Sequence, residues 1–555
     1  MSKTAAARAT LALFIFALRA GGQTFPQGVA CGDVTETSAI CWTRVSLPGS
    51  VRIDIATDDQ FQQIVVSNLV QASDDADRTV HHDAVGLSPG TRYFYRFTHL
   101  GTDETSPPGT FKTAPQGPTS FRFVYTGDSN AADQPFRVLS HAAAEQAELW
   151  FWAGDTAYCD GSAGGLPPAT DLAGYRAKHS QNRDDPFLQA LMAAVPVWVQ
   201  WDDHEVANDY DGGDLEPHIT PQQRADAYRA FFDYMPIRRQ GVADDPDRTY
   251  RSIRYGDLAE FFILDCRQYR SRDLSRDGGG IDPRAFFLPT LEIGTILRLS
   301  DPSRTMLGKR QLSWLKDGLQ RSTATWKFVL SSLPFTSLLV MPYDRWDGYD
   351  VERYDLLRFV DEQAITGVVL LSADIHGNVY NPDVTHFLRN TLQEGFSLGF
   401  VIPEFIAGPI ATESIRREIG LIGPLLFDTA VSEFIATPLF DFGFDFLMNT
   451  IIGENKLAFV EPDRFAYLVV DVTPEQLTLT HRGVVADSSI HDPPLETLHQ
   501  VVLAPPGPTS CFPAPLLPTF CCLMLAPLAR TRCRAGSARR RAARTLRLVA
   551  DSAQI

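Results

Sequence analysis

Acidic, histidine and tyrosine residues follow four apolar stretches of the chain at short spacing. The segments are VYTGDSN at 124–130, WAGDTAYCD at 152–160, WDDHEVAND at 201–209 and LSADIHG at 371–377. Carboxylate and phenolate oxygens bind hard cations, and histidine nitrogens often complete such sites. Two cations about 3.5–4 Å apart can activate a water molecule and stabilise both the attacking and the leaving oxygen of a phosphoryl group. The pattern is therefore typical of a metal-dependent phosphoesterase.

The first proposed metal would be held by residues from three of these segments. Asp155 is the candidate for a carboxylate that bridges two metals, and Asp128 would complete the shell of the first. Tyr158, three residues after Asp155, could present a phenolate to a trivalent ion such as iron. His376 would be the last ligand. The alternative for Tyr158 is a ring that only packs against the sheet.

The second proposed metal would be bound by Asp203 and Asp374 together with the bridging carboxylate. Asp202 competes with Asp203, which we favour because it directly precedes His204. His204 would then act as a general acid or contact the phosphate. A solvated surface histidine in an acidic DDHE run is the alternative.

The elements that must position these side chains are buried strands. The apolar runs 121–125, 149–153, 195–201 and 368–371 suit such strands, and the polar residues come just after each one. Open α/β sheets build their binding sites at the ends of strands. The glycines before Asp128 and Asp155 allow tight turns there. A single Gly-Asp pair is usually a plain turn, but the joint occurrence of GD, GDxxY, DDHE and DxH favours a metal site.

The chain resembles the PhoD-like alkaline phosphatase and phosphodiesterase family of the calcineurin-like metallophosphoesterases. Besides the four metal motifs, the resemblance rests on FPQGVACGDVTETSAICWTRV at 25–45, GLSPGTRYFYRF at 86–97, GTFKTAP at 109–115, LDCRQYR at 264–270, LGKRQLSWLKDGL at 307–319 and FIAGPIATES at 405–414. These segments run over roughly residues 25–485, in the order typical of the family.

The resemblance implies the roles of the site residues. Positions that match the metal-binding pattern are Asp128, Asp155, Tyr158, Asp203, Asp374 and His376, and His204 matches the catalytic histidine. Arg267 is expected to meet the phosphate through its guanidinium fork, with Arg270 as the competing choice and a surface ion pair as the alternative. The expected cofactors are two or more metal ions, Fe³⁺ and Ca²⁺.

Two departures from the family pattern affect the expected ions. Asp128 stands where some members have a cysteine, which leaves the identity of the metals open. Ser331 and Ser332 stand where the superfamily often has a histidine. The second metal would therefore lack one nitrogen ligand and be a harder, more weakly held cation.

Length and composition agree with an exported enzyme of ordinary globular character. The chain has 555 residues, is 44% hydrophobic and carries a formal net charge of −17. Its length requires more than one domain. The negative charge argues against a nucleic-acid-binding surface, because phosphates would be repelled.

The N-terminus is typical of a secretory signal peptide over residues 1–22. Lys3 and Arg8 precede the apolar run Leu11–Leu18, and small residues follow. No twin-arginine pair is present, so we expect the general secretory pathway and a secreted or cell-envelope protein. An uncleaved anchor is the alternative, although the apolar run is short for a membrane span.

The C-terminal tail, residues 505–555, differs from the rest. A PPGP linker leads into an apolar stretch at 512–528, and eight arginines follow between Arg530 and Arg547. The order favours a sorting or anchoring tail with a possible attachment to membrane or envelope. Several prolines weaken it as a membrane helix, and a disordered or frame-altered tail is the alternative. Elsewhere, Cys31 and Cys41 could pair across a small β-domain.

These observations predict a four-layer α-β-β-α metallophosphoesterase sandwich, as the resemblance implies, preceded by an Ig/fibronectin-like β-sandwich. We expect the β-sandwich at 27–115 and the catalytic domain at 120–490. The apolar segment at 385–455 would be a lid, a substrate-facing insertion or extra core. The expected function is hydrolysis of phosphate monoesters or diesters by metal-bound hydroxide. The alternative is an exported binding or adhesion protein whose catalytic fold has lost turnover.

Overall fold

The computed structural model of the chain describes residues 24–212, 219–272, 301–336, 344–385, 401–417 and 457–506. The signal peptide predicted at 1–22, the tail beyond Pro506 and most of the predicted apolar segment at 385–455 lie outside these residues. The described residues from Thr24 to Pro506 belong to one compact unit.

A nine-stranded mixed sheet carries half of the candidate site. Its order is β21 (Glu496–Leu503), β20 (Leu477–Val485), β19 (Arg464–Val472), β9 (Phe121–Thr126), β10 (Leu149–Ala153), β11 (Val197–Gln200), β1 (Val29–Gly32), β2 (Ser38–Arg44) and β5 (Thr79–Val85). Strands β9, β10 and β11 are parallel neighbours, with Ala153 beside Gln200. Because β10 is buried along its whole length, its sequence LWFWA is continuously apolar.

A seven-stranded sheet carries the other half. Its order is β12 (Arg251–Tyr255), β13 (Ala259–Ile263), β14 (Trp326–Leu330), β15 (Val368–Ser372), β17 (Glu404–Ile406), β16 (Asn378–Asn381) and β18 (Phe459–Glu461). Strands β13, β14, β15 and β17 run parallel. Their carboxyl ends therefore meet at one edge of the sheet.

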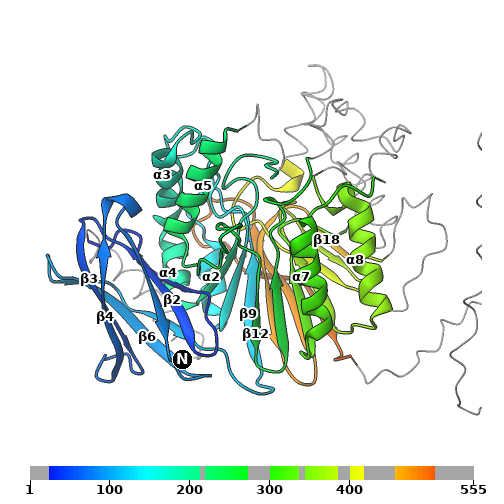
Figure 1. The fold of residues 1–555 in the computed structure, drawn as a ribbon, viewed down its shortest axis with the longest axis horizontal. Coiled ribbons are helices and arrows are strands. Elements are labelled where there is room, and N and C mark those ends of the chain that lie inside the picture. The colour runs from blue at the N-terminus through cyan, green and yellow to red at the C-terminus, as the bar shows by residue number, and fades with distance from the viewer. Residues whose placement is uncertain are drawn as a thin grey trace, which may run out of the picture. The chain divides into compact units, whose positions relative to one another are not determined.

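The two sheets pack face to face, and helices cover their outer faces (Figure 1). Between the sheets lies an aromatic core that includes Phe123, Phe151, Phe261 and Phe328, with ring centroids 4.5–5.4 Å apart in the contacting pairs. On the nine-stranded sheet lie α2 (Val138–Ala144), α3 (Leu172–Arg183), α4 (Pro186–Ala194) and α5 (Pro221–Tyr234). On the seven-stranded sheet lie α7 (Gly308–Arg321) and α8 (Asp350–Glu362).

Local sequence explains where two of the helices begin. Helix α5 starts at a capping box in which Thr220 and Gln223 satisfy each other's backbone amides, and Pro221 occupies the first turn. Helix α4 starts after Asp185, whose side chain accepts hydrogen bonds from Phe187 N and Leu188 N. Three 3₁₀ turns complete the described helical elements, η1 (Asp74–Ala76), η2 (Ala131–Asp133) and η4 (Trp346–Tyr349).

The N-terminal strands form a second β-sandwich that shares strands with the first sheet. The separate sheet contains β4 (Ile64–Ala72), β3 (Gly49–Ala56), β6 (Arg92–His99), β7 (Glu104–Thr105) and β8 (Gly109–Lys112). Its inner face packs on β1, β2 and β5. Strand β1 also pairs with β11 through Gly32 and Val197, so these three strands continue the nine-stranded sheet. The boundary at 115 and the Ig/fibronectin-like character remain predictions.

The mixed two-sheet architecture with outer helices agrees with the predicted layers. Within the described residues, no helix is long and apolar enough to cross a membrane.

Candidate metal centre

Every predicted site residue lies in a loop that follows the carboxyl end of a strand. Asp128 follows β9, and Asp155 follows β10. Asp203 and His204 follow β11, and Asp374 and His376 follow β15. The loops after β9 and β10 are joined by hydrogen bonds from Asp128 N to Gly154 O (3.2 Å) and from Ser129 N to Asp155 O (2.9 Å).

Four of the candidate ligands have a left-handed backbone. The φ angles are 62° at Asp128, 48° at Asp155, 70° at Asp374 and 50° at His376. Non-glycine residues rarely adopt this conformation, and the strain is concentrated at functional sites in many proteins. The sharp turns direct the side chains of these residues to one place.

Two glycines allow other backbone segments to approach these loops. Gly154 has φ +107°, and a Cβ there would lie 2.7 Å from Asp202 Cβ. A Cβ on Gly408 would lie 2.5 Å from Asp128 Oδ2. Both glycines have positive φ angles, and Gly154 also requires glycine for space.

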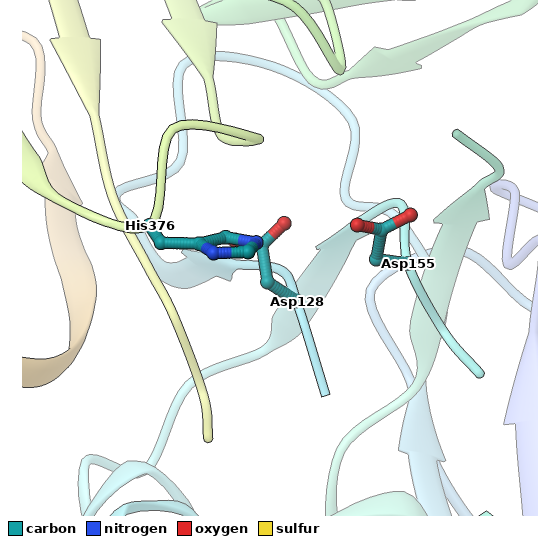
Figure 2. Close-up of side chains that lie close together, drawn as sticks. All are labelled: Asp128, Asp155 and His376. Atoms are coloured by element: carbon teal, nitrogen blue, oxygen red, sulfur yellow. The ribbon is translucent and has the colours of Figure 1, made fainter. Parts of the chain in front are cut away.

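The first group of ligands consists of Asp128, Asp155 and His376. One ligand atom from each lies within 4.8 Å of the others, and all three residues are buried. Figure 2 shows their side chains converging from three separate loops. The hydroxyl of Tyr158 is 2.9 Å from His376 Nε2, so the predicted phenolate lies beside this group.

Two further groups adjoin the first. One contains Asp155, Asp203 and His204, and the other contains Asp202, Asp203 and Asp374, each with ligand atoms within 4.8 Å of one another. Asp155 belongs to two groups and Asp203 also belongs to two. The structure therefore brings all six predicted ligands together, if Tyr158 is counted through its contact with His376.

Arg267 is buried and paired with carboxylates. Its Nε and Nη2 bond to the two oxygens of Asp202 at 2.5 and 2.9 Å, and Nη1 bonds to Asp344 at 2.9 Å. Nη2 also lies 3.3 Å from Asp203 and 3.4 Å from Asp374. The guanidinium fork predicted to meet phosphate is thus engaged by Asp202, and its contact with a phosphate remains a prediction.

Arg270, the competing choice, is also buried. Its Nη1 lies 2.7 Å from Asp344 Oδ1, and its Nη2 donates to Asp209 O at 2.8 Å. Burial raises the pKa of Asp344, but Arg267 and Arg270 outweigh it and hold that pKa well below its usual value. Sequence reasoning missed Asp344, because nothing in the segment YDRWDG indicates that two distant arginines share it.

His204 is oriented by two residues that belong to the motif after β10. Its Nδ1 lies 2.8 and 3.0 Å from the two oxygens of Asp160. Asp160 also accepts a hydrogen bond from Asn208 N at 2.6 Å. The ring of Tyr158 stacks on the imidazole with centroids 4.1 Å apart. Sequence reasoning missed Asp160, although it lies in the same segment as Asp155, five residues later.

Glu205 ties two of the site loops together. Its carboxylate accepts hydrogen bonds from Thr156 N and Thr156 Oγ1 (2.5 and 2.6 Å) and from Asp202 N (2.9 Å). Burial raises the pKa of Glu205 to about 7. Ser332, one of the two serines after β14, donates to Asp202 Oδ1 at 2.7 Å.

The electrostatics of the site are those of crowded, buried carboxylates. Burial and then neighbouring carboxylates raise the pKa of Asp374, and burial and Asp203 raise that of Asp155 despite the opposing effect of His204. For His204, burial lowers the pKa, but Asp155, Asp203 and Asp160 together raise it well above its usual value. Oxygen-rich, acidic groups of this kind suit metal ions, because a cation relieves the repulsion between the carboxylates.

Comparisons of the sequence with known proteins find PhoD-like phosphatases. A family model described as PhoD-like phosphatase matches residues 123–480, and another, described as its N-terminal domain, matches residues 9–115. Alkaline phosphatase D of Bacillus subtilis (strain 168) is 32% identical over 393 residues, which cover 64% of this chain. The chain spans 64% of the length of that relative.

Solved structures give a similar result. A structure described as PhoD matches with a TM-score of 0.71 and 26% identity, over 87% of this chain and 91% of the other. A purple acid phosphatase from yellow lupin (Lupinus luteus) seeds matches with 14% identity and a TM-score of 0.47, over 86% of this chain and 73% of the other.

Proposed function

Because the chain belongs to the PhoD-like phosphatase family, we propose that it is a metal-dependent phosphoric ester hydrolase of the alkaline phosphatase D type. Its substrates would be small phosphate monoesters, diesters or both. The observation that carries the proposal is the set of adjoining ligand groups, in which Asp155 is shared. A shared carboxylate between two oxygen-rich groups is what a two-metal phosphoesterase requires.

The residues proposed to hold the metals follow the three groups. Asp128, Asp155, Tyr158 and His376 would hold the first ion, for which we propose Fe³⁺. Asp155, Asp203 and Asp374 would hold the second, for which we propose Ca²⁺. When bound, the metals would activate the water nucleophile and neutralise charge on the phosphoryl oxygens.

His204 is proposed to deliver a proton to the leaving oxygen. The surrounding carboxylates favour its protonated form, since they raise its pKa. Asp160 bonds to Nδ1, which leaves Nε2 as the nitrogen that would donate. Arg267 is proposed to support the site by holding Asp202 in place beside Asp203 and Asp374.

The proposal includes the location of the protein. We propose that it is exported and is either secreted or attached to the cell envelope through its C-terminal tail. We expect no nucleic-acid partner.

Metal content and ester hydrolysis test the function together. The purified protein would be assayed with p-nitrophenyl phosphate and bis-p-nitrophenyl phosphate, before and after chelation and as Asp155→Asn. We expect bound metal, and activity that falls to background after chelation and in the variant. The exposed Asp317→Asn is the matched control and should keep full activity. A metal-free, inactive wild-type protein would instead favour the binding-protein alternative.

A further inference from the structure

Two cysteines of the N-terminal β-sandwich face each other across paired strands. Cys31 on β1 and Cys41 on β2 are direct partners in the antiparallel register. The other cysteines in the described part of the chain, Cys159 and Cys266, lie in different core regions.

Both cysteines are free thiols in this structure, but their strand register is compatible with a cross-strand disulfide. Directly opposed residues of antiparallel strands have Cα atoms about 4.5–5.5 Å apart, and disulfides span Cα separations of about 4.4–6.8 Å. Both side chains belong to the same core between the two sheets of the sandwich, so they point to the same face. Their neighbours Ala30 and Trp42 point to the opposite face and join another core.

We propose that Cys31 and Cys41 form a disulfide when the chain folds in the presence of a disulfide oxidant such as glutathione disulfide. One cysteine thiolate attacks the oxidant, forms a mixed disulfide and releases one thiol. The second thiolate then displaces the other thiol and forms the Cys31–Cys41 bond. Two cysteine protons are released, and two electrons pass to the oxidant, which becomes two thiolates that take up protons.

Burial determines when this exchange takes place. Both cysteines are fully buried in the folded sandwich. Burial, followed by the hydrogen bond to the Cys41 side chain, raises the pKa of Cys31 well above its usual value. A buried thiol that keeps its proton is a poor nucleophile. The bond therefore forms before the sandwich closes, and the closed sandwich then protects it from reductants.

The position of the bond gives it a structural effect near the candidate metal centre. Strand β1 lies between β2 and β11, and β11 leads directly to Asp202 and Asp203. The loop closed by the bond contains Asp33, which forms a buried ion pair with Arg251 at 2.8 Å. The disulfide would link β1 covalently to β2 at the point where the sandwich continues into the nine-stranded sheet.

Peptide mapping of the full-length wild-type protein tests the proposal. The protein would be refolded with glutathione disulfide, denatured, alkylated with iodoacetamide and digested with trypsin. No lysine or arginine lies between Arg19 and Arg44, so one peptide contains both cysteines. We expect this peptide without alkyl groups and lighter by two hydrogen atoms than its reduced form. The peptides with Cys159 and Cys266 are internal controls and should be alkylated.

A stability measurement gives a second readout that does not depend on the digest. The wild-type protein refolded with the oxidant should melt several degrees higher than the same protein refolded with a phosphine reductant. The double variant Cys31→Ala/Cys41→Val should lack this difference. Two alkyl groups on the peptide, or a bond from either residue to another cysteine, would overturn the proposal. Equal melting temperatures of the two wild-type preparations would do so as well.

Discussion

His204 is surrounded by groups that fix both its orientation and its charge. Asp160 binds Nδ1, and Tyr158 stacks on one face of the ring. Asp155 and Asp203 belong to the same candidate ligand group as the imidazole. The arrangement gives the imidazole one available nitrogen. At the residue scale, we therefore expect the proposed role of His204 to depend on Asp160, which binds its Nδ1.

The substitution Asp160→Asn tests that dependence. An asparagine cannot stabilise the imidazolium, so we expect kcat to fall by about 10- to 100-fold for alkyl phosphate esters, with little change in KM. The loss should be smaller for p-nitrophenyl esters, because p-nitrophenolate leaves without much help from an acid. Steady-state kinetics with both leaving groups measure the difference. The exposed Asp244→Asn is the control, and an equal loss on both esters would show that Asp160 acts only through the fold.

Arg267 is expected to matter first for stability. It is fully buried and contacts Asp202, Asp203, Asp344 and Asp374, so Arg267→Met leaves several buried carboxylates uncompensated. We expect a loss of about 3–5 kcal/mol in the free energy of unfolding, measured by chemical denaturation of the chelated protein.

Two other substitutions make this measurement specific. Arg267→Lys keeps the charge but loses the fork, and should recover only part of the stability. Arg321 forms an exposed ion pair with Asp317, so Arg321→Met should cost less than about 1 kcal/mol. An unchanged free energy of unfolding in Arg267→Met would contradict the prediction, because it would mean that the buried ion pairs make no net contribution to stability.

At the scale of elements, the parallel strands determine where the candidate ligands meet. Strands β9, β10 and β11 in one sheet and β13 and β15 in the other each lead, at their carboxyl ends, into a segment that holds a candidate site residue. The loops are tight because glycine precedes the first two aspartates. Small changes in these turns should therefore move several ligands at once.

Gly154→Ala tests the packing of the turn after β10. The new Cβ would lie 2.7 Å from Asp202 Cβ on a backbone with φ +107°, and the loop must shift away from its neighbour. We expect a stability loss of about 3 kcal/mol together with loss of bound metal and activity. Gly86→Ala is the matched control, because Gly86 has φ +74° and no atom within 4 Å of the added Cβ. Its cost should be only about 1–2 kcal/mol, with full activity.

At the scale of the whole molecule, the N-terminal sandwich and the catalytic sheets share structure. Strands β1, β2 and β5 belong to the nine-stranded sheet and also form one wall of the sandwich core. The Asp33–Arg251 ion pair adds a buried contact from this region to β12 of the other sheet. We therefore expect residues 24–506 to unfold as one cooperative unit.

Histidines that are buried in neutral form should lower the stability of this unit below pH 6.5. Burial lowers the pKa of His179 to about 3 and those of His81 and His481 to about 4. Between these values and the unfolded pKa of about 6.5, the unfolded chain binds more protons than the native protein, so stability falls as pH falls. His179 alone should contribute a loss of about 2 kcal/mol at pH 5.

His179→Phe isolates this effect. The ring stacks on Tyr234, and within the described residues neither of its nitrogens has a hydrogen-bond partner. We expect the variant to lose less stability than the wild type between pH 7.5 and pH 5, measured by urea denaturation at both values. The exposed His491→Phe controls for the loss of a surface histidine. An identical pH dependence of wild type and His179→Phe would contradict the prediction.

The sequence by itself determined which residues to consider and which family the chain belongs to. Strand, turn and candidate ligand lie within a few consecutive residues at Asp128, Asp155, Asp203 and Asp374, so local pattern was enough to propose them. The family assignment is confirmed by the comparisons. The two-sheet layering follows from the same runs of buried apolar residues.

Only the tertiary structure decided how these residues are paired. Arg267 engages Asp202, Asp344 joins two arginines, Asp160 orients His204, and Cys31 faces Cys41. The structure also showed that the N-terminal strands continue the catalytic sheet. The physical reason is that buried polar groups need partners, and segments far apart in the sequence are brought together only by the packing of the two sheets. Tyr158 and His376, for example, are 218 residues apart.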